Sequence, residues 1–273
     1  MVMAVVIAYP LIDTLRLSFS EVELGRDATP FIGLQNFADV LDDRVFGTTL
    51  RNTFVWTVLS VSLIVVLGLL AALTVNERFP GRTTVRSTIL IPWIIPGIVA
   101  AVTWKWLYHP DFGVINDFLI RAGFIAGPTN WLADPFRGLY AVIVVNVWKG
   151  FPFAMLMLLA GLQGVPEDLY DAARVDGANA WHRLVYVTLP HLRPVLIVVA
   201  LLQTIWNMNT FTYVYVLTGG GPIRLTEVLG VYIYNMAFQS FKFGMASAAA
   251  VIVFVISASL SIAYLRVLRA SGT

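Results

Sequence analysis

The sequence contains no cysteine and few charged side chains. The absence of cysteine in its 273 residues excludes disulfides and thiolate chemistry. Charged residues make up 12% of the chain, against roughly 25% in an ordinary soluble domain. A soluble fold of this size could not cover its surface with so few charges. The net charge of +2 is also too small to indicate a nucleic-acid partner.

The sequence also lacks the motifs of nucleotide-binding, metal-binding and catalytic sites. No glycine-rich phosphate loop ending in Gly-Lys-Ser/Thr is present, and the lysines are Lys105, Lys149 and Lys242 alone. The three histidines lack metal-ligand spacing, and no nucleophile-elbow pattern occurs. We therefore predict no catalytic residue, no metal and no cofactor in this chain. If it takes part in active transport, a partner must supply the energy.

Long apolar stretches dominate what is present. Hydrophobic residues make up 58% of the chain, and the mean hydropathy is +0.79. A helix needs about 20 apolar residues to cross a bilayer core of roughly 30 Å. The sequence therefore predicts an all-α bundle forming a single transmembrane domain over residues 1–273, with six spans at about 1–19, 53–75, 87–107, 138–162, 194–217 and 243–265.

The first span is the weakest of the six. Asp13 and Arg16 interrupt it, and only its first twelve residues are uncharged. It lacks the basic flank that usually precedes a first span. We therefore expect the start of this sequence to lie inside or near that span.

Charge in the loops predicts the orientation in the membrane. Cytoplasmic loops carry an excess of Lys and Arg. The loops 76–86 and 163–193 and the tail from 266 hold eight arginines in about fifty residues. The loops 20–51, 108–137 and 218–245 hold seven Lys and Arg in about ninety residues, with ten Asp and Glu. We place the first set in the cytoplasm, with both termini, in the cell membrane of a bacterium or archaeon.

Several spans contain helix breakers. Pro92, Pro96 and Gly97 lie in the third span, and Gly150 and Pro152 lie in the fourth. Any single proline is as consistent with a simple kink as with a break, but several breaks in one small bundle favour a pathway, because broken helices usually face protein or a water-filled cavity. The segment 225–241 is expected to lie at the outer interface without crossing.

The loop 163–193 between the fourth and fifth spans is predicted to form two short helices joined by a turn, which we call the elbow. Pro166 suits a first helical position, and the acidic residues after it complement the positive end of a helix. Gly177 ends or turns that helix. A second short helix is expected over 181–187, ending before Pro190. Small residues in the elbow would let another protein approach closely, although an ordinary amphipathic connector would look similar.

The same loop resembles the EAA motif of ABC-transporter permeases. The family pattern is Glu-Ala-Ala, three residues, Gly, and a later Leu-Pro. Here Asp replaces the Glu, keeping the charge, and Leu184 replaces an aromatic residue that the family often carries. The resemblance implies a coupling helix that docks into a cytoplasmic ATPase through Asp171, Ala172, Ala173, Asp176, Gly177, Ala178 and Pro190.

The resemblance extends over nearly the whole chain. The stretches 31–37, 217–222 and 243–248 look like the sugar-importing permeases related to the maltose and glycerol-3-phosphate systems, and the chain resembles the maltose-F-type subunit. The family implies the type I importer permease fold, a second homologous permease, an ATPase dimer that binds ATP and Mg, and an extracytoplasmic solute-binding protein. It also implies alternating access in the lipid bilayer, with a sugar or related polyol as substrate.

The fifth span is unusually polar for mid-membrane. Amides and hydroxyls there are costly without a partner, so they serve either as helix-helix hydrogen bonds or as a sugar site. By spacing, Gln203, Trp206, Asn207 and Thr210 share one helix face. By position relative to the family's motifs, the sugar-contacting residues would be Gln203, Trp206, Asn207 and Thr210 in the fifth span, with Asn146, Gly150 and Phe153 in the fourth.

Lys149 departs from an all-neutral sugar site. An intramembrane charge is expected to face a cavity or a partner. It could contact an anionic solute such as a phosphate ester, pair with the second permease, or have a structural role, which we favour. An ABC permease for a glycerol phosphate, or for a non-sugar solute such as an amino acid, is the alternative function. A membrane scaffold without transport is the third hypothesis.

Overall fold

The computed structural model describes residues 2–22, 25 and 29–271, and within this part of the chain the structure is built from helices. An isolated bridge joins Ser20 to Phe31, but no named strand occurs among the described residues. The predicted all-α fold is therefore confirmed.

Four helical runs are long and apolar enough to cross a membrane. They are α3 (Arg44–Asn76), α7 (Gly138–Gln163), the run Ala180–Met208 and α13 (Phe243–Ser271). The first predicted span is α1 (Val2–Ser18), which packs against α13. The bent pair α4 (Arg82–Ile94) and α5 (Gly97–Leu107) supplies another span.

Two of the predicted spans are not continuous helices. α4 and α5 meet at an angle of 95°, which confirms a break at Pro96. The predicted span 194–217 also contains a break, because α10 (Leu189–Met208) ends before α11 (Thr212–Thr218). Asn209 to Phe211 separate the two, and no proline in this segment signals the break.

The helix breakers of the fourth span do not interrupt it. α7 runs without interruption through Gly150 and the buried Pro152. Gly150 instead permits close packing, because a Cβ there would lie 2.7 Å from Cδ1 of Ile64 on α3. The glycine in this helix is explained by its neighbour and not by a kink.

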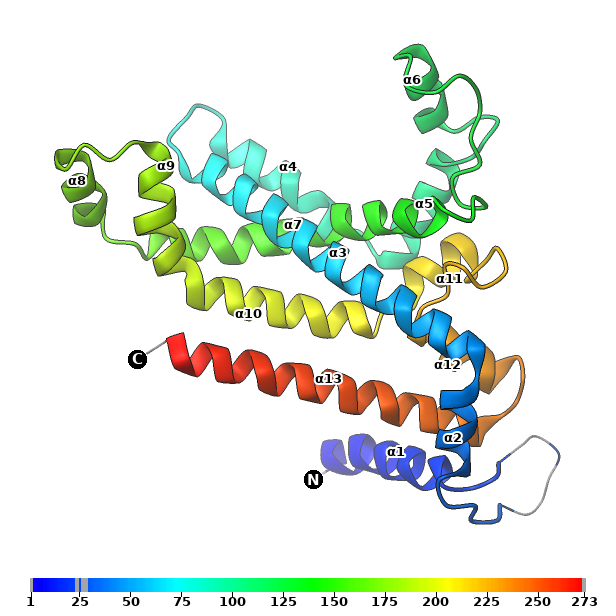
Figure 1. The fold of residues 1–273 in the computed structure, drawn as a ribbon. Helices are drawn as coiled ribbons and strands as arrows, with labels where there is room; N and C mark the ends of the chain where they lie inside the picture. The colour runs from blue at the N-terminus through cyan, green and yellow to red at the C-terminus, as the bar shows by residue number, and fades with distance from the viewer. Residues whose placement is uncertain (1, 23–24, 26–28, 272–273) are drawn as a thin grey trace.

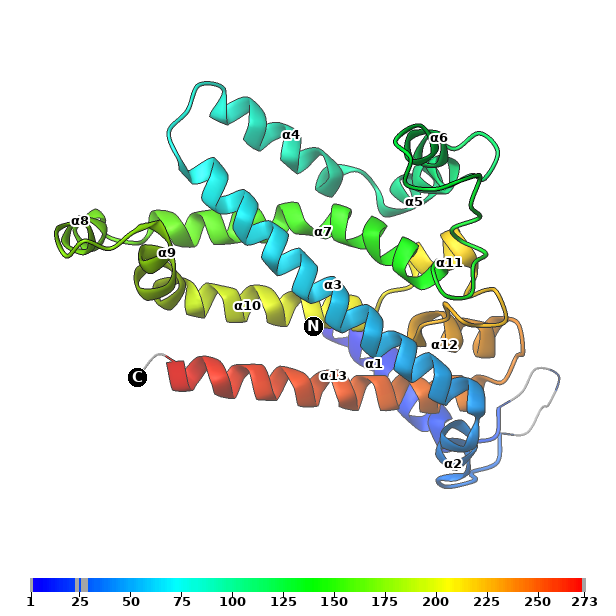
Figure 2. The same ribbon diagram turned by 45° about the horizontal axis from the view of Figure 1, so that its top comes forward.

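The connecting elements gather at two opposite ends of the bundle. One end carries α2 (Gln35–Asp42), α6 (Val114–Arg121), α11 and α12 (Leu229–Phe238) (Figures 1 and 2). The other end carries α8 (Glu167–Val175), the α3–α4 turn and the C-terminal end of α13. The basic loops therefore lie at one end and the more acidic loops at the other. α12 has ten residues and is too short to cross.

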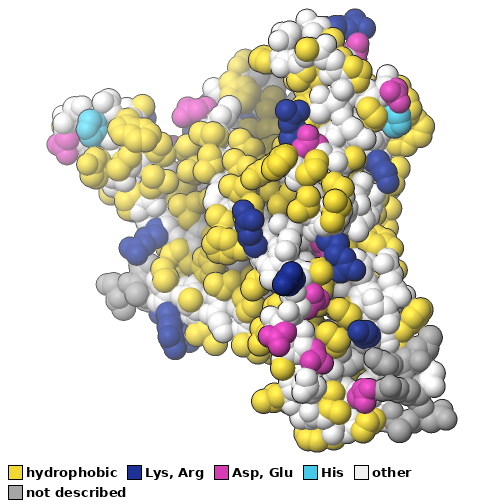
Figure 3. Space-filling model, turned by 45° about the vertical axis from the view of Figure 1, so that its right-hand side comes forward, with side chains coloured by type: hydrophobic (Ala, Val, Ile, Leu, Met, Phe, Trp, Pro, Cys, Tyr) yellow, Lys and Arg dark blue, Asp and Glu magenta, His cyan; other side chains and the backbone are white. Residues whose placement is uncertain are grey.

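Hydrophobic side chains cover much of the molecular surface (Figure 3). Large apolar residues on the spans, such as Phe54, Ile94 and Phe254, are exposed. A soluble protein rarely exposes apolar surface on this scale. The pattern fits a chain whose outer surface meets lipid tails or other membrane subunits.

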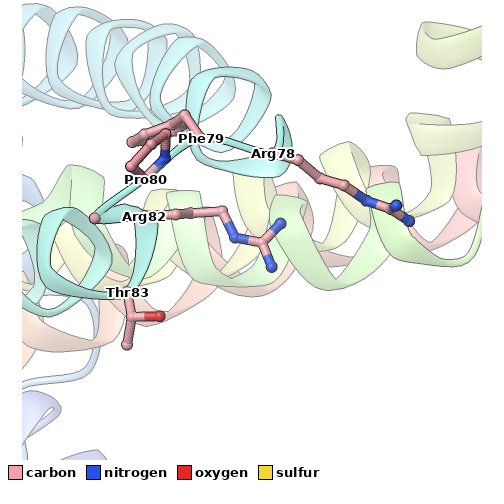
Figure 4. A pocket seen from close by; sticks show the side chains of 6 residues that line it. Arg78, Phe79, Pro80, Arg82 and Thr83 are labelled. Atoms are coloured by element: carbon pink, nitrogen blue, oxygen red, sulfur yellow. The ribbon is translucent and has the colours of Figure 1, made fainter.

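Two arginines cap the C-terminal end of α3. Arg86 donates from Nε and Nη2 to the main-chain carbonyl of Val75, at 3.2 and 2.8 Å, and Arg82 donates to the carbonyl of Asn76. An open hollow lies at the same turn, and the side chains of Arg78 and Arg82 extend to one side of it (Figure 4). Cations near a helix C-terminus are stabilising, so these arginines have a structural role as well as marking the basic side.

At the opposite end, the Thr-Gly-Gly-Gly-Pro stretch covers a buried acid. Glu227 is fully buried, and its Oε1 accepts a hydrogen bond of 2.8 Å from Nδ2 of Asn235. Gly220 has a φ of +90°, and a Cβ there would lie 3.2 Å from Cβ of Glu227. Burial raises the pKa of the Glu227 carboxyl. The glycines thus permit a tight turn directly over this side chain.

The packing of α3 on α7 forms the centre of the bundle. The helices approach closely at Gly68, where a Cβ would lie 2.6 Å from Cβ of Ala154 and 3.0 Å from the main-chain nitrogen of Met155. Small residues allow such close approach between membrane helices. Trp56 and Ile64 on α3 are buried in the same core.

We expect Gly68→Ala to destabilise the protein by about 1–3 kcal/mol, because the new methyl group meets main-chain atoms that cannot move aside. Gly47→Ala on the same helix is the matched control, since nothing lies within 4 Å of its Cβ position. The measurement is the thermal unfolding midpoint of the assembled transporter in detergent. Equal midpoints for the two variants would contradict this view of the α3–α7 contact.

Candidate functional site

Three of the predicted site residues lie on one face of α7. Asn146, Gly150 and Phe153 follow one another at helical spacing. Asn146 contacts α10, Phe153 contacts α4 and α10, and Gly150 lies between α3 and α10. Both of these neighbouring helices end nearby, α4 at Ile94 and α10 at Met208. The face of α7 is thus flanked by the two breaks in the bundle.

Three amides form a buried network between α7 and α10. Nδ2 of Asn146 donates to Oδ1 of Asn207 at 2.7 Å. Nδ2 of Asn207 donates to the main-chain carbonyl of Gln203 at 2.8 Å and lies 3.5 Å from its Oε1. The residues are 8%, 4% and 3% exposed, in the order Asn146, Asn207 and Gln203. The bond between Asn146 and Asn207 joins α7 to α10, which is the helix-helix bonding that the sequence left open beside a sugar site.

An aromatic surface lies beside this network. The rings of Phe153 and Trp206 are edge to face, with centroids 5.0 Å apart. Trp93, near the end of α4, continues the row with its ring centroid 5.8 Å from that of Phe153. Trp206 is 49% exposed and Trp93 is 44% exposed. Such open ring faces suit the apolar side of a sugar ring.

Sequence reasoning missed Trp93. Its signal was its position between Pro92 and Pro96, at a break that the prolines did predict. The structure brings Gly150 close to the amides, because a Cβ there would lie 3.8 Å from Oε1 of Gln203. Thr210 lies in the second break, and its main-chain nitrogen donates to the carbonyl of Asn207. The main-chain carbonyl of Thr210 lies directly against Gly230 on α12.

Lys149 points toward the first break. Its Nζ donates a 2.7 Å hydrogen bond to the main-chain carbonyl of Trp93. The ammonium thus has a partner within the chain, at the C-terminal end of α4. This contact favours the structural role over that of a ligand for an anionic solute.

The predicted coupling loop forms a helix with a defined stop. Asp171, Ala172 and Ala173 lie on α8, and Asp176 follows its last residue. Gly177 has a φ of +76° and donates to the carbonyl of Arg174, while Ala178 donates to that of Ala173. This pair of bonds is a Schellman motif, which requires the left-handed conformation that glycine adopts at no steric cost. No residue of α8 is buried within this chain.

The second helix of the elbow does not end before Pro190, so that prediction is wrong. α9 (Ala180–Arg183) passes into a π-helical turn, η1 (Leu184–Thr188), and then into α10, which includes Pro190 and Pro194. A wider turn of this kind is a common accommodation for a residue that disturbs the regular hydrogen-bond ladder. Tyr170 on α8 bonds to Thr188 in η1 with 3.0 Å between their hydroxyl oxygens. The elbow is therefore continuous with the polar fifth span.

We expect Asn146→Leu to lower stability by about 1–3 kcal/mol, because Oδ1 of Asn207 would lose its donor while buried. Val144→Leu, at an exposed position of the same helix, serves as the control. The unfolding midpoint of the assembled transporter is the measurement. If Asn146→Leu has the same unfolding midpoint as Val144→Leu, the amide network does not hold α7 to α10.

Comparison with known proteins places the chain in a family. Residues 64–270 match the family described as binding-protein-dependent transport system inner membrane component. The chain is 41% identical to the trehalose/maltose transport system permease protein MalF of Thermococcus litoralis, over 98% of this chain and 90% of that protein. It is 36% identical to the trehalose transport system permease protein SugA of Mycobacterium tuberculosis, over 100% of this chain and 86% of that protein.

Solved structures agree on the fold. One similar chain belongs to a bacterial ABC transporter involved in the import of the acidic polysaccharide alginate. The TM-score is 0.86 and the sequence identity 23%, and the alignment covers 98% of this chain and 91% of that chain. A chain of the MetNI methionine ABC transporter has a TM-score of 0.60, with 21% identity, and covers 82% of this chain and 94% of its own. The chain is therefore a multi-pass membrane transport component with the ABC importer permease fold, and it belongs to the family of inner-membrane components of binding-protein-dependent transport systems.

Proposed function

We propose that this chain is the permease subunit of an ATP-driven importer for a neutral disaccharide, an oligosaccharide or a related polyol. The observation that carries the proposal is the aromatic surface of Phe153 and Trp206 beside three amides, at the point where two broken spans meet α7. Aromatic faces and amides together match the two sides of a sugar ring, its apolar face and its hydroxyls. The relatives with trehalose or maltose in their names support this substrate class.

We assign the solute contacts to both parts of the site. The rings of Phe153 and Trp206 supply the stacking surface, and the amides lie behind them. When solute enters, its hydroxyls take over hydrogen bonds that the amides make with one another in this structure. The full set of proposed solute residues is Asn146, Gly150, Phe153, Gln203, Trp206, Asn207 and Thr210.

We further propose that a cytoplasmic ATPase dimer docks on the elbow and that a second, homologous permease completes the pathway. The exposed surface of α8 supports such docking, because none of its residues is buried within this chain. The proposed coupling residues are Asp171, Ala172, Ala173, Asp176, Gly177, Ala178 and Pro190. ATP and Mg would be bound by the partner, both termini would be cytoplasmic, and a solute-binding protein would deliver the sugar from outside.

The substrate is tested by ATPase activity of the complex in lipid with its binding protein. We expect stimulation by a neutral disaccharide or oligosaccharide in a panel that also contains glycerol phosphates and amino acids. Stimulation by a glycerol phosphate alone would replace the proposed substrate with a phosphorylated one. Stimulation by an amino acid alone would contradict the sugar assignment.

Coupling is tested by Gly177→Val. We expect solute-stimulated ATPase activity to fall to the basal rate, because a β-branched residue at a φ of +76° carries about 1–2 kcal/mol of strain and distorts the end of α8. Gly123→Val is the matched control, since Gly123 also has a φ of +76° with nothing within 4 Å, but lies after α6 at the other end of the bundle. Full stimulation of the Gly177 variant, once inserted and assembled, would contradict the coupling assignment.

A further inference from the structure

A cavity lies between α3, α10 and α13, on a different side of α10 from the candidate functional site. α10 packs against both α3 and α13, and these two helices diverge with distance from α2 (Figures 1 and 2). The space that they leave has a volume of about 400 Å³. On α10 it is lined by Thr204 and Met208, whereas Asn207 bonds to α7. The cavity is therefore separate from the amides and rings of the candidate site.

Most of the free surface of this cavity is hydrocarbon. The Thr204 hydroxyl donates to the main-chain carbonyl of Ala200 at 2.7 Å, and its oxygen lies 3.2 Å from the hydroxyl oxygen of Tyr264. The hydroxyl oxygen of Thr57, on the α3 wall, is buried. A sugar or an ion would find few free polar partners here, so the cavity suits an apolar ligand.

The cavity opens on the apolar surface of the spans. Phe54 and Val58 on α3 and Leu260 on α13 line it and are 68%, 45% and 38% exposed. These residues lie in stretches without charge, 52–76 on α3 and 243–265 on α13. An empty apolar cavity forfeits van der Waals contacts of its lining atoms. At this depth a bilayer supplies acyl chains that can restore those contacts.

Two exposed arginines continue the open side of the cavity toward the start of α3. Arg51 precedes Phe54 by three residues and Val58 by seven, and Arg44 precedes Arg51 by seven, so the four share one stripe of the helix. Among the described residues, the guanidinium groups of Arg44 and Arg51 have no hydrogen-bond or ion-pair partner. Both charges are therefore free to bind an anion.

Arg51 lies where the apolar part of α3 ends. It is the last charged residue before the uncharged stretch, and its neighbour Asn52 donates to the main-chain carbonyls of Leu225 and Glu227 in the segment before α12. Helical side chains point back toward the N-terminus of their helix, so the Arg51 side chain extends away from the apolar stretch. This places a cation at headgroup level beside a cavity of acyl-chain character.

We propose that the cavity binds an anionic phospholipid of the surrounding bilayer, with one acyl chain between α3, α10 and α13 and the phosphate on Arg51. A guanidinium binds a phosphate through two parallel hydrogen bonds. Arg44, two turns away, adds a second positive charge that favours an anionic headgroup over a zwitterionic one. The site depends on neither the solute nor the direction of transport.

The test uses the assembled transporter in phosphatidylcholine vesicles with a trace of a photoreactive lipid that carries a diazirine in one acyl chain. Labelled peptides are mapped by mass spectrometry. With phosphatidylglycerol as the probe, we expect labelling over residues 50–62 and 256–264, about 5-fold stronger than with the matching phosphatidylcholine probe. The exposed Val66, on α3 outside the cavity, gives the level for ordinary lipid contact.

Two pairs of variants locate the chain and the headgroup. Val61→Phe fills the cavity and is expected to reduce labelling there to the level at Val66, whereas Val66→Phe is the matched control. Arg51→Gln is expected to lower labelling by phosphatidylglycerol about 5-fold, to that of phosphatidylcholine. Arg121→Gln, at an exposed arginine of α6 at the same end of the bundle, should leave it unchanged.

The unaltered transporter alone can overturn the proposal. Cavity labelling no stronger than at Val66 would mean that another subunit covers this face. Equal labelling by the two lipids, or no effect of Arg51→Gln, would show that a chain enters without recognition of an anionic headgroup. Unchanged labelling in Val61→Phe would place the acyl chain outside the cavity.

Discussion

A helix that is broken inside a membrane must find partners for the main-chain groups that the break frees. The third and fifth spans are both broken, at Pro96 and between Asn209 and Phe211. The helices that follow these breaks, α5 and α11, pack on each other, and the hydroxyl of Tyr213 lies 3.3 Å from where a Cβ of Gly97 would be. The freed carbonyl of Trp93 is satisfied by Lys149. The charged side chain of Lys149 in a hydrophobic span therefore helps to stabilise the break in the third span.

The candidate site follows from these breaks. Because α4 and α10 both end beside α7, the last turns of two helices present Trp93 and Trp206 to the same face of a third. Behind the rings, the amides bond across α7 and α10 and hold the helices together. Asn146 and Asn207 can therefore both join the helices and contact solute. A sugar hydroxyl can donate and accept hydrogen bonds, so it can replace either amide as the partner of the other.

The spans and one of the two breaks could be predicted from the sequence, whereas the second break and the place of Trp93 could not. Long uncharged stretches predict spans because a bilayer demands them, and Pro96 predicts a break because it lacks an N–H. The break after Met208 carries no such residue and depends on packing with α5 and α12. Gly150 was misjudged for the converse reason, since its role is to admit Ile64 and not to bend α7. Trp93 could not be assigned because its place beside Phe153 is a tertiary contact between distant segments.

We infer that solute binds where the two broken spans meet α7. A structure of the assembled transporter with its binding protein and a bound neutral oligosaccharide would test this inference. We expect sugar density against the rings of Phe153 and Trp206, within hydrogen-bond reach of the amides of Asn146, Gln203 or Asn207. Density confined to another part of the bundle, with these rings buried against protein, would contradict it.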